Sequence, residues 1–259
     1  MDLDTLSRFA TDLAIEAGKL LKKGYGTLFT ISSKEGKHNL VTEYDFLSEK
    51  LIIKKILEKY PHHFILSEEK GRTGEKHAVQ WIVDPLDGTV NFAHNIPMFA
   101  VSIGIMIEDK LFFGVVYNPM TDELFTAREN QGAFLNGKKV EVSGTDKLDN
   151  AILATGFPYN VKEDPFYCIE RFAKILHLGI PIRRMGVASL DLCYVAAGRF
   201  DGFWEVGLQP WDCAAGKIII EEAKGKITDW KMGKYDILID MPIMASNGHI
   251  HKEIHEALS

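Results

Sequence analysis

The sequence predicts a layered protein of the mixed α/β or α+β class. Apolar residues recur every three or four positions over much of the first 60 residues, as in helices with one buried face. From Phe64 onward, short continuous apolar runs follow, as in buried strands. Both patterns return in the second half of the chain, and this mixture favours helices packed on sheets.

The first two predicted elements are helices. Apolar residues at helical spacing occupy residues 6–21, and Gly24 can end that helix. A second helix is predicted to begin at Thr42, because Asp45 stands three residues later as in a capping box. It should stop before Pro61. Asp45 is therefore expected in the first turn of a helix.

Strands are predicted where apolar runs stand between charged, Gly, Asn or Pro residues. In the first half these runs are residues 64–66, 81–83, 99–107 and 111–117, the last two pairing as an antiparallel hairpin. In the second half the predicted strands are 151–155, 181–185, 203–206, 236–240 and 242–246, and the predicted helices 165–178, 189–197, 212–223 and 249–258. The turn-rich segment 142–150 can divide two halves.

The composition predicts a folded, soluble protein. Its 259 residues are 46% apolar and 25% charged, close to the globular average. A net charge of −6 makes nucleic acid an unfavoured partner, and three scattered cysteines indicate neither disulfides nor a cysteine zinc site. No secretory signal is recognisable, and the longest apolar stretch, residues 99–107, is too short to span a bilayer. We therefore expect a cytoplasmic protein without a membrane segment.

The most informative stretch is residues 81–92, where an apolar strand ends in two acids. Asp84 and Asp87 surround a proline that stops ladder pairing, and Gly88 then allows a sharp turn. If a helix starts at Thr89, its free N–H groups form an anion site beside the two carboxylates. Anion donors next to two acids make sense only if a cation lies between them.

Each acid also has an ordinary structural interpretation. Asp-Gly pairs are commonly turns, as we expect for Asp201-Gly202. Glu68 and Glu69 follow a predicted strand and could simply be solvated, whereas Asp212 begins a predicted helix and could be an N-cap. The residues alone leave open whether these acids meet.

The chain nevertheless resembles the inositol monophosphatase family of metal-dependent phosphomonoesterases. Residues 81–92 resemble that family's first signature, with Leu86 where Ile is frequent, and residues 211–225 resemble its second, with Lys224 where Gly or His is usual. Ser67 replaces the Gly that usually precedes the Glu-Glu pair, and none of these departures removes a candidate ligand. The likeness extends through residues 32–45, 132–143, 154–158, 186–206 and 245–251, essentially the whole chain.

The resemblance implies a two- or three-metal Mg²⁺ site with oxygen ligands only, which agrees with the preference of a hard cation. The implied ligands are Glu68, Asp84, the Leu86 carbonyl, Asp87 and Asp212, with Asp45 in an outer or third-metal position. The implied catalytic set is Glu68, Asp84, Asp87, Thr89 and Asp212, with Thr89 and Glu68 orienting the attacking water. The implied substrate-binding set is Lys34, Gly88, Thr89, Gly186, Ala188, Glu205 and Asp212.

The implied fold is the layered α-β-α-β-α sandwich of the sugar-phosphatase superfamily. Residues 1–145 would form an N-terminal α+β half with most metal ligands, and residues 146–259 a C-terminal α/β half with Asp212 and the substrate-selecting residues. The two halves would form one compact unit. Homodimers are usual in the family, and the apolar region 99–117 is expected to contribute to that contact.

The implied activity is Mg²⁺-dependent, lithium-sensitive hydrolysis of a small phosphate monoester, foremost myo-inositol 1- or 4-phosphate. Related motifs also serve fructose 1,6-bisphosphate, nucleotide 3′-phosphate and histidinol phosphate phosphatases. A different class of function is a regulatory protein that binds the transcription or RNA machinery, as some bacterial relatives do. We interpret His249, His251 and His255 as part of a solvated terminal helix rather than a zinc site, because no further ligand accompanies them.

Overall fold

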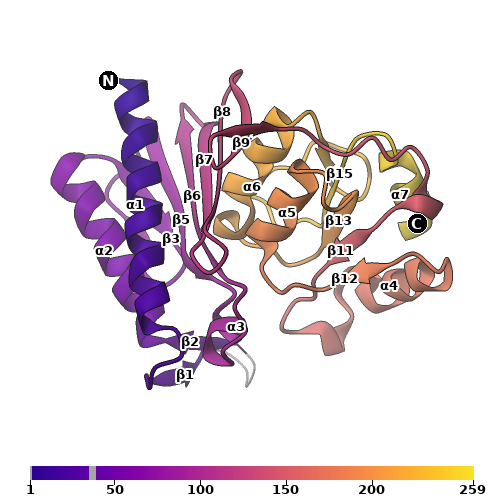
Figure 1. Ribbon diagram of the computed structural model, residues 1–259, viewed down its shortest axis with the longest axis horizontal. Helices are drawn as coiled ribbons and strands as arrows, with labels where there is room; N and C mark the ends of the chain where they lie inside the picture. Colours follow the sequence, from indigo (N-terminus) through magenta and orange to yellow (C-terminus); the bar gives the residue numbers. More distant parts are fainter. Residues whose placement is uncertain (1, 35–38) are drawn as a thin grey trace.

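Two sheets separate three layers of helices in the computed structural model, which describes residues 2–34 and 39–259. The helices cover the large sheet on its outer side, fill the space between the sheets, and cover the small sheet on its outer side (Figure 1). In that order they are α1 (Leu3–Gly24) and α2 (Glu43–Lys59), α5 (Ala188–Ala196) and α6 (Pro210–Glu222), and α4 (Cys168–His177) and α7 (His251–Leu258). The predicted α-β-α-β-α fold is confirmed.

The large sheet contains the predicted strands and adds less apolar ones at its edges. Its order is β10 (Lys138–Val140), β9 (Gly132–Leu135), β8 (Glu123–Arg128), β7 (Lys110–Asn118), β6 (Ala100–Ile107), β5 (Val79–Asp87), β3 (Phe64–Ser67) and β4 (Gly71–Thr73). β6 and β7 form the predicted antiparallel hairpin, with Glu108 and Asp109 at positive φ in its turn. Sequence analysis missed β4 and β8–β10, because these strands lack continuous apolar runs.

The small sheet has the order β12 (Ile182–Arg183), β11 (Leu153–Thr155), β13 (Gly202–Glu205), β15 (Ile243–Ser246) and β14 (Lys226–Thr228). β11 runs parallel to both of its neighbours, so β11 and β13 end at the same edge. A separate ribbon pairs β1 (Ile31–Ser33) with β2 (Leu40–Thr42). Within the resembling stretch 32–45, residues 35–38 lie outside the described residues.

Two local predictions in the second half were wrong. Residues 236–240 form a turn instead of a strand, because the Asp236 carboxylate accepts the N–H of Leu238 and bends the chain. Gly202 begins β13 instead of forming a turn, and the buried Asp201 accepts hydrogen bonds from the Ser143 hydroxyl and the Ile152 N–H. The first error came from a local turn, and the second came from partners of Asp201 that are distant in the sequence.

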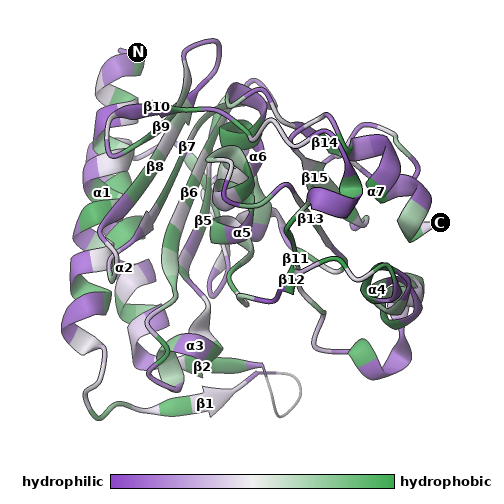
Figure 2. Cartoon of the chain, turned by 45° about the vertical axis from the view of Figure 1, so that its right-hand side comes forward, coloured by the Kyte–Doolittle hydropathy of each residue, from purple (hydrophilic) through white to green (hydrophobic). Residues whose placement is uncertain are grey.

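Apolar side chains form three buried clusters, one between the two sheets, one between the large sheet and α1 and α2, and one between the small sheet and α4 and α7. Hydrophobic residues recur along the strands and along the helices that cover them (Figure 2). α1 and α6 cover opposite faces of β6 and β7, so most of the side chains in region 99–117 are buried inside the chain. The expectation that this region contributes a dimer contact is therefore wrong. Large apolar side chains are instead exposed on and around α4, at Phe166, Tyr167, Ile169, Leu176 and Leu178. No helix in the described part of the chain is long and apolar enough to cross a membrane.

Candidate active site

The end of β5 places two carboxylates on one side of the large sheet. Asp84 pairs with Ser102 of β6 and Asp87 with Ala100, so three steps along β5 match two steps along β6. This bulge follows from Pro85, which lacks the N–H that ladder pairing needs. Without it, Asp84 and Asp87 would point to opposite faces, because side chains alternate along a strand. The bulge at Pro85 therefore brings the Asp84 and Asp87 side chains to the same side of the sheet.

Hydrogen bonds orient both carboxylates. The Leu86 N–H donates to Asp84 over 3.0 Å, and the Ser189 N–H of α5 donates to Asp87 over 2.8 Å. Burial raises the pKa of Asp84 well above its usual range, with further contributions from the charges of Glu68, Asp87 and Asp212. Burial likewise raises the pKa of Asp87 to about 6. These acids lie close enough to disfavour one another's ionisation, the situation that a bound cation relieves.

Gly88 and α3 (Thr89–Ala93) follow directly, as predicted for a helix starting at Thr89. Gly88 has a φ of +92°, and a Cβ there would lie 2.9 Å from the Val187 side chain and 3.1 Å from the Met98 carbonyl. Glycine is therefore required by both backbone conformation and space. The first N–H groups of α3 have no acceptor within the helix.

Asp45 is fully buried and connects α2 to this turn. Its carboxylate accepts the N–H and hydroxyl of Thr42 over 2.8 and 2.6 Å, which confirms the predicted capping box. Its other oxygen lies 2.7 Å from the Thr89 hydroxyl, which is also 3.1 Å from the Leu86 carbonyl. Burial raises the pKa of Asp45. Three predicted site residues, Asp45, Leu86 and Thr89, are thus joined by direct contacts.

Lys34 approaches the same acids from the β1–β2 ribbon. Its ammonium donates to Glu68 over 2.9 Å and to Glu69, which follow β3. Burial lowers the pKa of Lys34, but the two carboxylates more than offset this and raise it overall. Burial raises the pKa of Glu69 to about 7, despite the contact with Lys34. The Lys34 ammonium therefore already offsets part of the negative charge of Glu68 and Glu69.

Asp212 comes from the other side, in the first turn of α6. It forms a capping box in which its carboxylate accepts the Gln209 N–H over 2.7 Å. Burial raises the pKa of Asp212 well above its usual range, and the charge of Asp87 is the next cause. The N-cap interpretation was therefore wrong in detail, because Gln209 is the N-cap of α6 and Asp212 is the third residue of the helix, whose carboxylate caps the Gln209 N–H.

The predicted substrate-selecting residues line the C-terminal side. Gly186 has a φ of +72°, and Ala188 begins α5 beside Ser189. Glu205 ends β13 opposite Gly156, where a Cβ would lie 2.2 Å from the Glu205 carboxylate. Burial raises the pKa of Glu205 to about 8, and the charge of Asp87 adds to the effect. Within residues 2–34 and 39–259, no hydrogen bond holds the Glu205 carboxylate.

The oxygen atoms of the candidate ligands suit a hard cation, although their side chains are not gathered closely enough to surround one. Carboxylates and the Leu86 carbonyl are oxygen donors of the kind that Mg²⁺ prefers. Burial raises the pKa values of Asp84, Asp87 and Asp212, and the charges of neighbouring acids add to the effect. As the side chains stand, no three carboxylate, imidazole or thiolate groups within residues 2–34 and 39–259 are close enough together to hold a metal. Binding would therefore require small side-chain movements, foremost of the Glu68 carboxylate away from Lys34.

Sequence reasoning missed the residues that support these ligands. Ser189 reaches Asp87 through its backbone N–H, which no side-chain motif can reveal. Ser48 and Glu49 of α2 bond the turns that carry the acids. Their only sequence signal is that both are polar residues near the apolar face of a predicted helix.

The rival histidines do not form a zinc site. His251 is buried rather than solvated, because its two ring nitrogens lie 2.9 Å from the Thr228 hydroxyl and 2.8 Å from the Ser246 hydroxyl. His63 is also buried and accepts the indole N–H of Trp81. The interpretation of a solvated C-terminal helix was therefore wrong for His251, although its environment remains structural.

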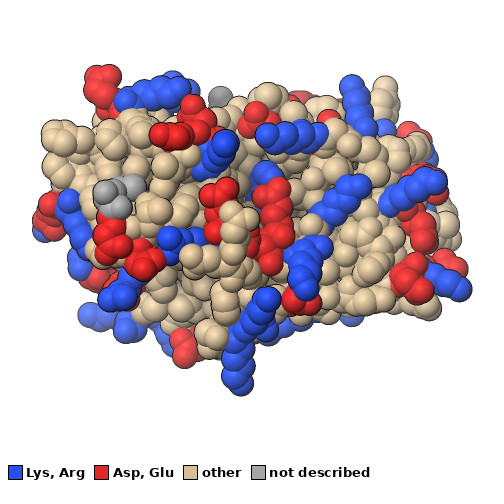
Figure 3. Space-filling view, turned by 90° about the horizontal axis from the view of Figure 1, so that it is seen from above, with Lys and Arg blue, Asp and Glu red and all other residues tan. Residues whose placement is uncertain are grey.

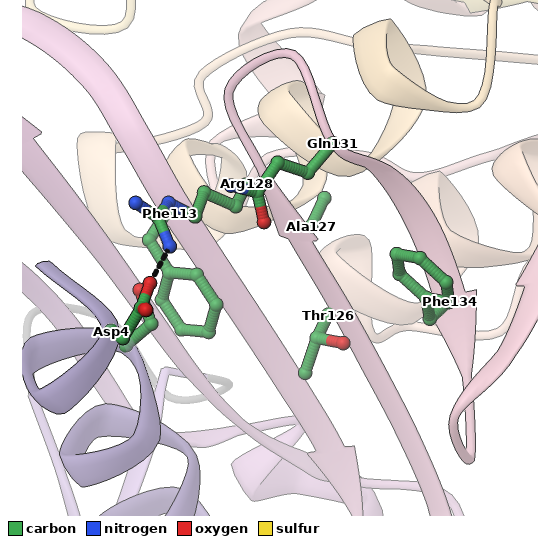
Figure 4. Close-up of a pocket in the computed structure, with 8 residues that line it drawn as sticks. Asp4, Phe113, Thr126, Ala127, Arg128, Gln131 and Phe134 are labelled. Atoms are coloured by element: carbon green, nitrogen blue, oxygen red, sulfur yellow. Dashed lines mark hydrogen bonds and ion pairs between the residues drawn. The ribbon is translucent and has the colours of Figure 1, made fainter.

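Other surfaces of the molecule offer weaker candidates. A hollow of about 240 Å³ lies between α1 and β7–β9, but its arginine, Arg128, is already paired with Asp4 (Figure 4). Acidic and basic side chains are interspersed on the face shown in Figure 3. That face lacks the single-sign field expected of a nucleic-acid surface.

Comparison with known proteins agrees with this geometry. The model of the inositol monophosphatase family matches residues 2–259. "Nus factor SuhB" of Escherichia coli K12 is 43% identical over 245 residues, covering 94% of this chain and 91% of that protein. "Inositol-1-monophosphatase" of Synechocystis is 41% identical, covering 100% and 90%. The solved structure of extragenic suppressor protein suhB from Bartonella henselae superimposes with a TM-score of 0.93 at 40% identity, covering 98% of both chains.

Proposed function

Because the chain belongs to the inositol monophosphatase family, we propose that it hydrolyses myo-inositol 1- or 4-phosphate to myo-inositol and phosphate in an Mg²⁺-dependent reaction. The observation that carries this proposal is the group of buried acids at the end of β5, next to the start of α3 and facing Asp212. The name of the Synechocystis relative supports the inositol substrate. The site has the two properties needed, oxygen donors for cations and N–H donors for a phosphate.

Glu68, Asp84, the Leu86 carbonyl, Asp87 and Asp212 would hold the cations, with Asp45 at an outer position. When bound, Mg²⁺ would lower the pKa of a coordinated water and offset the repulsion between phosphate and the attacking oxygen. The N–H groups of Gly88 and Thr89 would bind the phosphate oxygens. Lys34 would contribute positive charge on the same side once Glu68 turns toward the cations.

Thr89 and Glu68 would orient the attacking water. The Thr89 hydroxyl is within hydrogen-bond distance of the Asp45 carboxylate. When it donates its hydrogen there, its oxygen is left free to accept a hydrogen bond from water. Water would then attack the phosphorus in line with the leaving oxygen, without a phosphorylated enzyme. Asp84 and Asp212 would lie on the leaving-group side.

Glu205, Gly186 and Ala188 would contact the alcohol. The Glu205 carboxyl lies against Gly156, and we expect it to bond hydroxyl groups of a polyol. A polyol with several hydroxyls would satisfy a polar group that otherwise lacks a partner. This arrangement favours a sugar-like or inositol-like substrate over an apolar alcohol.

A comparison of kcat/KM across related substrates tests the proposal. The panel is myo-inositol 1- and 4-phosphates, fructose 1,6-bisphosphate, a nucleoside 3′-phosphate and histidinol phosphate, each assayed with Mg²⁺ and again with added lithium. We expect the inositol phosphates to be preferred by about tenfold or more, which corresponds to about 1.4 kcal/mol, and lithium to inhibit. A higher kcat/KM for any other substrate would reassign the activity.

A second candidate is a regulatory role in transcription, favoured by the name "Nus factor SuhB" of the E. coli relative. The full set of candidate metal ligands argues against a purely non-catalytic protein. It says nothing about whether the protein also binds a regulatory partner. Affinity capture from a lysate with wild-type protein and with Asp87→Asn, each with and without Mg²⁺, tests this role. Capture of transcription proteins by both forms would support it, and capture of none would exclude it.

We further propose that the protein is a homodimer in contact through the surface of Phe166, Tyr167, Ile169, Leu176 and Leu178. These five side chains are 46–65% exposed, unlike the buried region 99–117. Sedimentation velocity of wild type and of Leu176→Asp tests the assignment. A dimeric wild type and a monomeric variant are expected, and a monomeric wild type would contradict it.

A further inference from the structure

We propose that Ser48 and Glu49 are positioning residues that hold the two acid-bearing turns, 68–70 and 84–87, in their cation-binding arrangement. This inference rests on the proposed Mg²⁺ site. Neither side chain is itself a ligand in the proposed function. Both act through the backbone of residues that are.

The first observation is the burial of polar groups on the inner face of α2. Asp45 and Ser48 are fully buried and Glu49 is 6% exposed, next to the apolar Ile52 and Ile56. Ionised carboxylates are almost never buried without partners, since desolvation is costly. The hydrogen-bond partners of these three polar side chains therefore indicate what the inner face of α2 does.

Ser48 bonds the turn at the end of β5. Its hydroxyl donates to the Pro85 carbonyl over 2.8 Å. Pro85 lies within the bulge, where residues 85 and 86 have no partner residues in β6. The Ser48 hydroxyl thus supports the backbone at the point where ladder pairing is interrupted, directly between Asp84 and the Leu86 carbonyl.

Glu49 bonds the turn after β3. One of its carboxylate oxygens accepts the N–H groups of Glu69 and Lys70 over 3.0 and 2.9 Å. Charge-assisted bonds of this kind are among the stronger ones in proteins. They fix the peptide that follows Glu68, and so determine where the Glu68 carboxylate can reach.

The two contacts come from adjacent residues of one helix. α2 therefore connects the β3 turn, the β5 turn and, through Asp45, the Thr89 hydroxyl. A rigid helix that touches all three keeps their spacing constant when cations bind. Residues that orient metal ligands typically change metal affinity by about 10- to 100-fold when they are replaced.

The chain provides a matched control for a merely structural effect. Glu222 at the end of α6 accepts the N–H groups of Asn130 and Gly132 over 2.7 Å each, in the β8–β9 connection. It makes the same kind of bond as Glu49, but to a turn that carries no site residue. Loss of either carboxylate should lower thermal stability, and only loss of Glu49 should weaken Mg²⁺ binding.

The experiment measures Mg²⁺ binding by calorimetry on the full chain, for wild type, Glu49→Gln, Ser48→Ala and Glu222→Gln, together with each melting temperature. We expect the Kd for Mg²⁺ to rise about tenfold or more in Glu49→Gln and about threefold in Ser48→Ala. Glu222→Gln should bind like wild type despite a lower melting temperature. In assays, extra Mg²⁺ should restore most of the kcat of the two α2 variants.

Wild-type Mg²⁺ affinity in a folded Glu49→Gln would overturn the inference while leaving the proposed function intact. If Glu49→Gln does not fold, Ser48→Ala decides the matter by the same comparison with wild type. An equal loss of affinity in Glu222→Gln would also overturn it, because general destabilisation would then explain the effect. Wild-type protein that binds no Mg²⁺ would overturn the proposed function, and the inference with it.

Discussion

Most of the acids on the two sides of the candidate site differ in how they are held, whereas Asp212 on the C-terminal side accepts the Gln209 N–H and resembles the N-terminal acids. On the N-terminal side, Asp45, Asp84 and Asp87 accept hydrogen bonds from neighbouring N–H or hydroxyl groups. On the C-terminal side, Glu205 has a pKa raised to about 8 by burial, and Asp191 of α5 has a buried carboxylate oxygen without a partner. Carboxyl groups are thus held by hydrogen bonds on the N-terminal side, whereas Glu205 and Asp191 on the C-terminal side keep free hydrogen-bonding capacity.

This difference separates two tasks. Fixed carboxylates suit ligands that must meet cations at defined positions, because catalysis depends on preorganised charge. A carboxyl group with free bonding capacity suits recognition of hydroxyl groups that arrive with the substrate. We therefore expect changes on the N-terminal side to lower kcat and changes at Glu205 to raise KM.

The largest expected effect is that of Asp87→Asn on turnover. An amide can neither supply the negative charge nor replace both oxygens that the proposed cation site needs, so kcat should fall by at least about 10³-fold. Steady-state kinetics measures the loss, and thermal unfolding verifies that the variant is folded. Retained turnover would remove Asp87 from the proposed ligands and weaken the contrast between the two sides.

Metal removal should have the next largest effect. The five acids of the proposed site, Asp45, Glu68, Asp84, Asp87 and Asp212, should repel a phosphate group unless cations offset their charge. Calorimetry with inorganic phosphate should show binding with Mg²⁺ and at least about 100-fold weaker binding after EDTA treatment. Equal phosphate affinity in both conditions would contradict the proposed role of these acids.

Glu205→Gln should affect substrate affinity and not turnover. Above its pKa of about 8, the Glu205 carboxylate can accept bonds from two hydroxyls, whereas an amide has one acceptor oxygen. We expect KM for inositol 1-phosphate to rise about tenfold at pH 9, less at pH 7, with kcat nearly unchanged. Kinetics at both pH values measures this. A fall in kcat at constant KM would move Glu205 to the catalytic side of the comparison.

The smallest effect concerns stability away from the acids. Burial lowers the pKa of His251 from 6.5 to about 4, with Lys226 and His255 adding to the effect. The unfolded chain then binds a proton between these pH values and the folded chain does not, so stability is lost as pH falls through this range. The contribution should be about 1 kcal/mol between pH 7 and pH 5.5.

Urea unfolding of wild type and His251→Gln at several pH values tests this expectation. The variant should be less stable at pH 7, because it loses bonds to Ser246 and Thr228. The difference from wild type should narrow as the pH falls from 6.5 toward 4. If the difference in unfolding free energy between wild type and variant stays constant with pH, His251 does not titrate in this range. The loss of stability at low pH would then come mainly from the buried acids.

Much of the fold could be predicted because it depends on local patterns. The helix of residues 6–21, the capping box at Thr42 and the β6–β7 hairpin each have signals within a few residues. Residues 236–240 were mispredicted because Asp236 forms a turn that competes with a strand-like pattern. Strands β8–β10, at one end of the large sheet, have no distinctive local pattern and form by pairing with neighbours already in the sheet.

Local sequence is enough to predict the acid-bearing turn after β5, because the residues of segment 84–89 follow one another and Pro85 and Gly88 dictate how their backbone bends. Which distant groups contact the acid-bearing turns depends on tertiary packing. The Ser189 N–H, the Ser48 hydroxyl and the Glu49 carboxylate reach the acid-bearing turns across gaps of 20 residues or more in the sequence. Those contacts depend on how helices pack on sheets, and burial there, rather than residue type, determines which acids have raised pKa values.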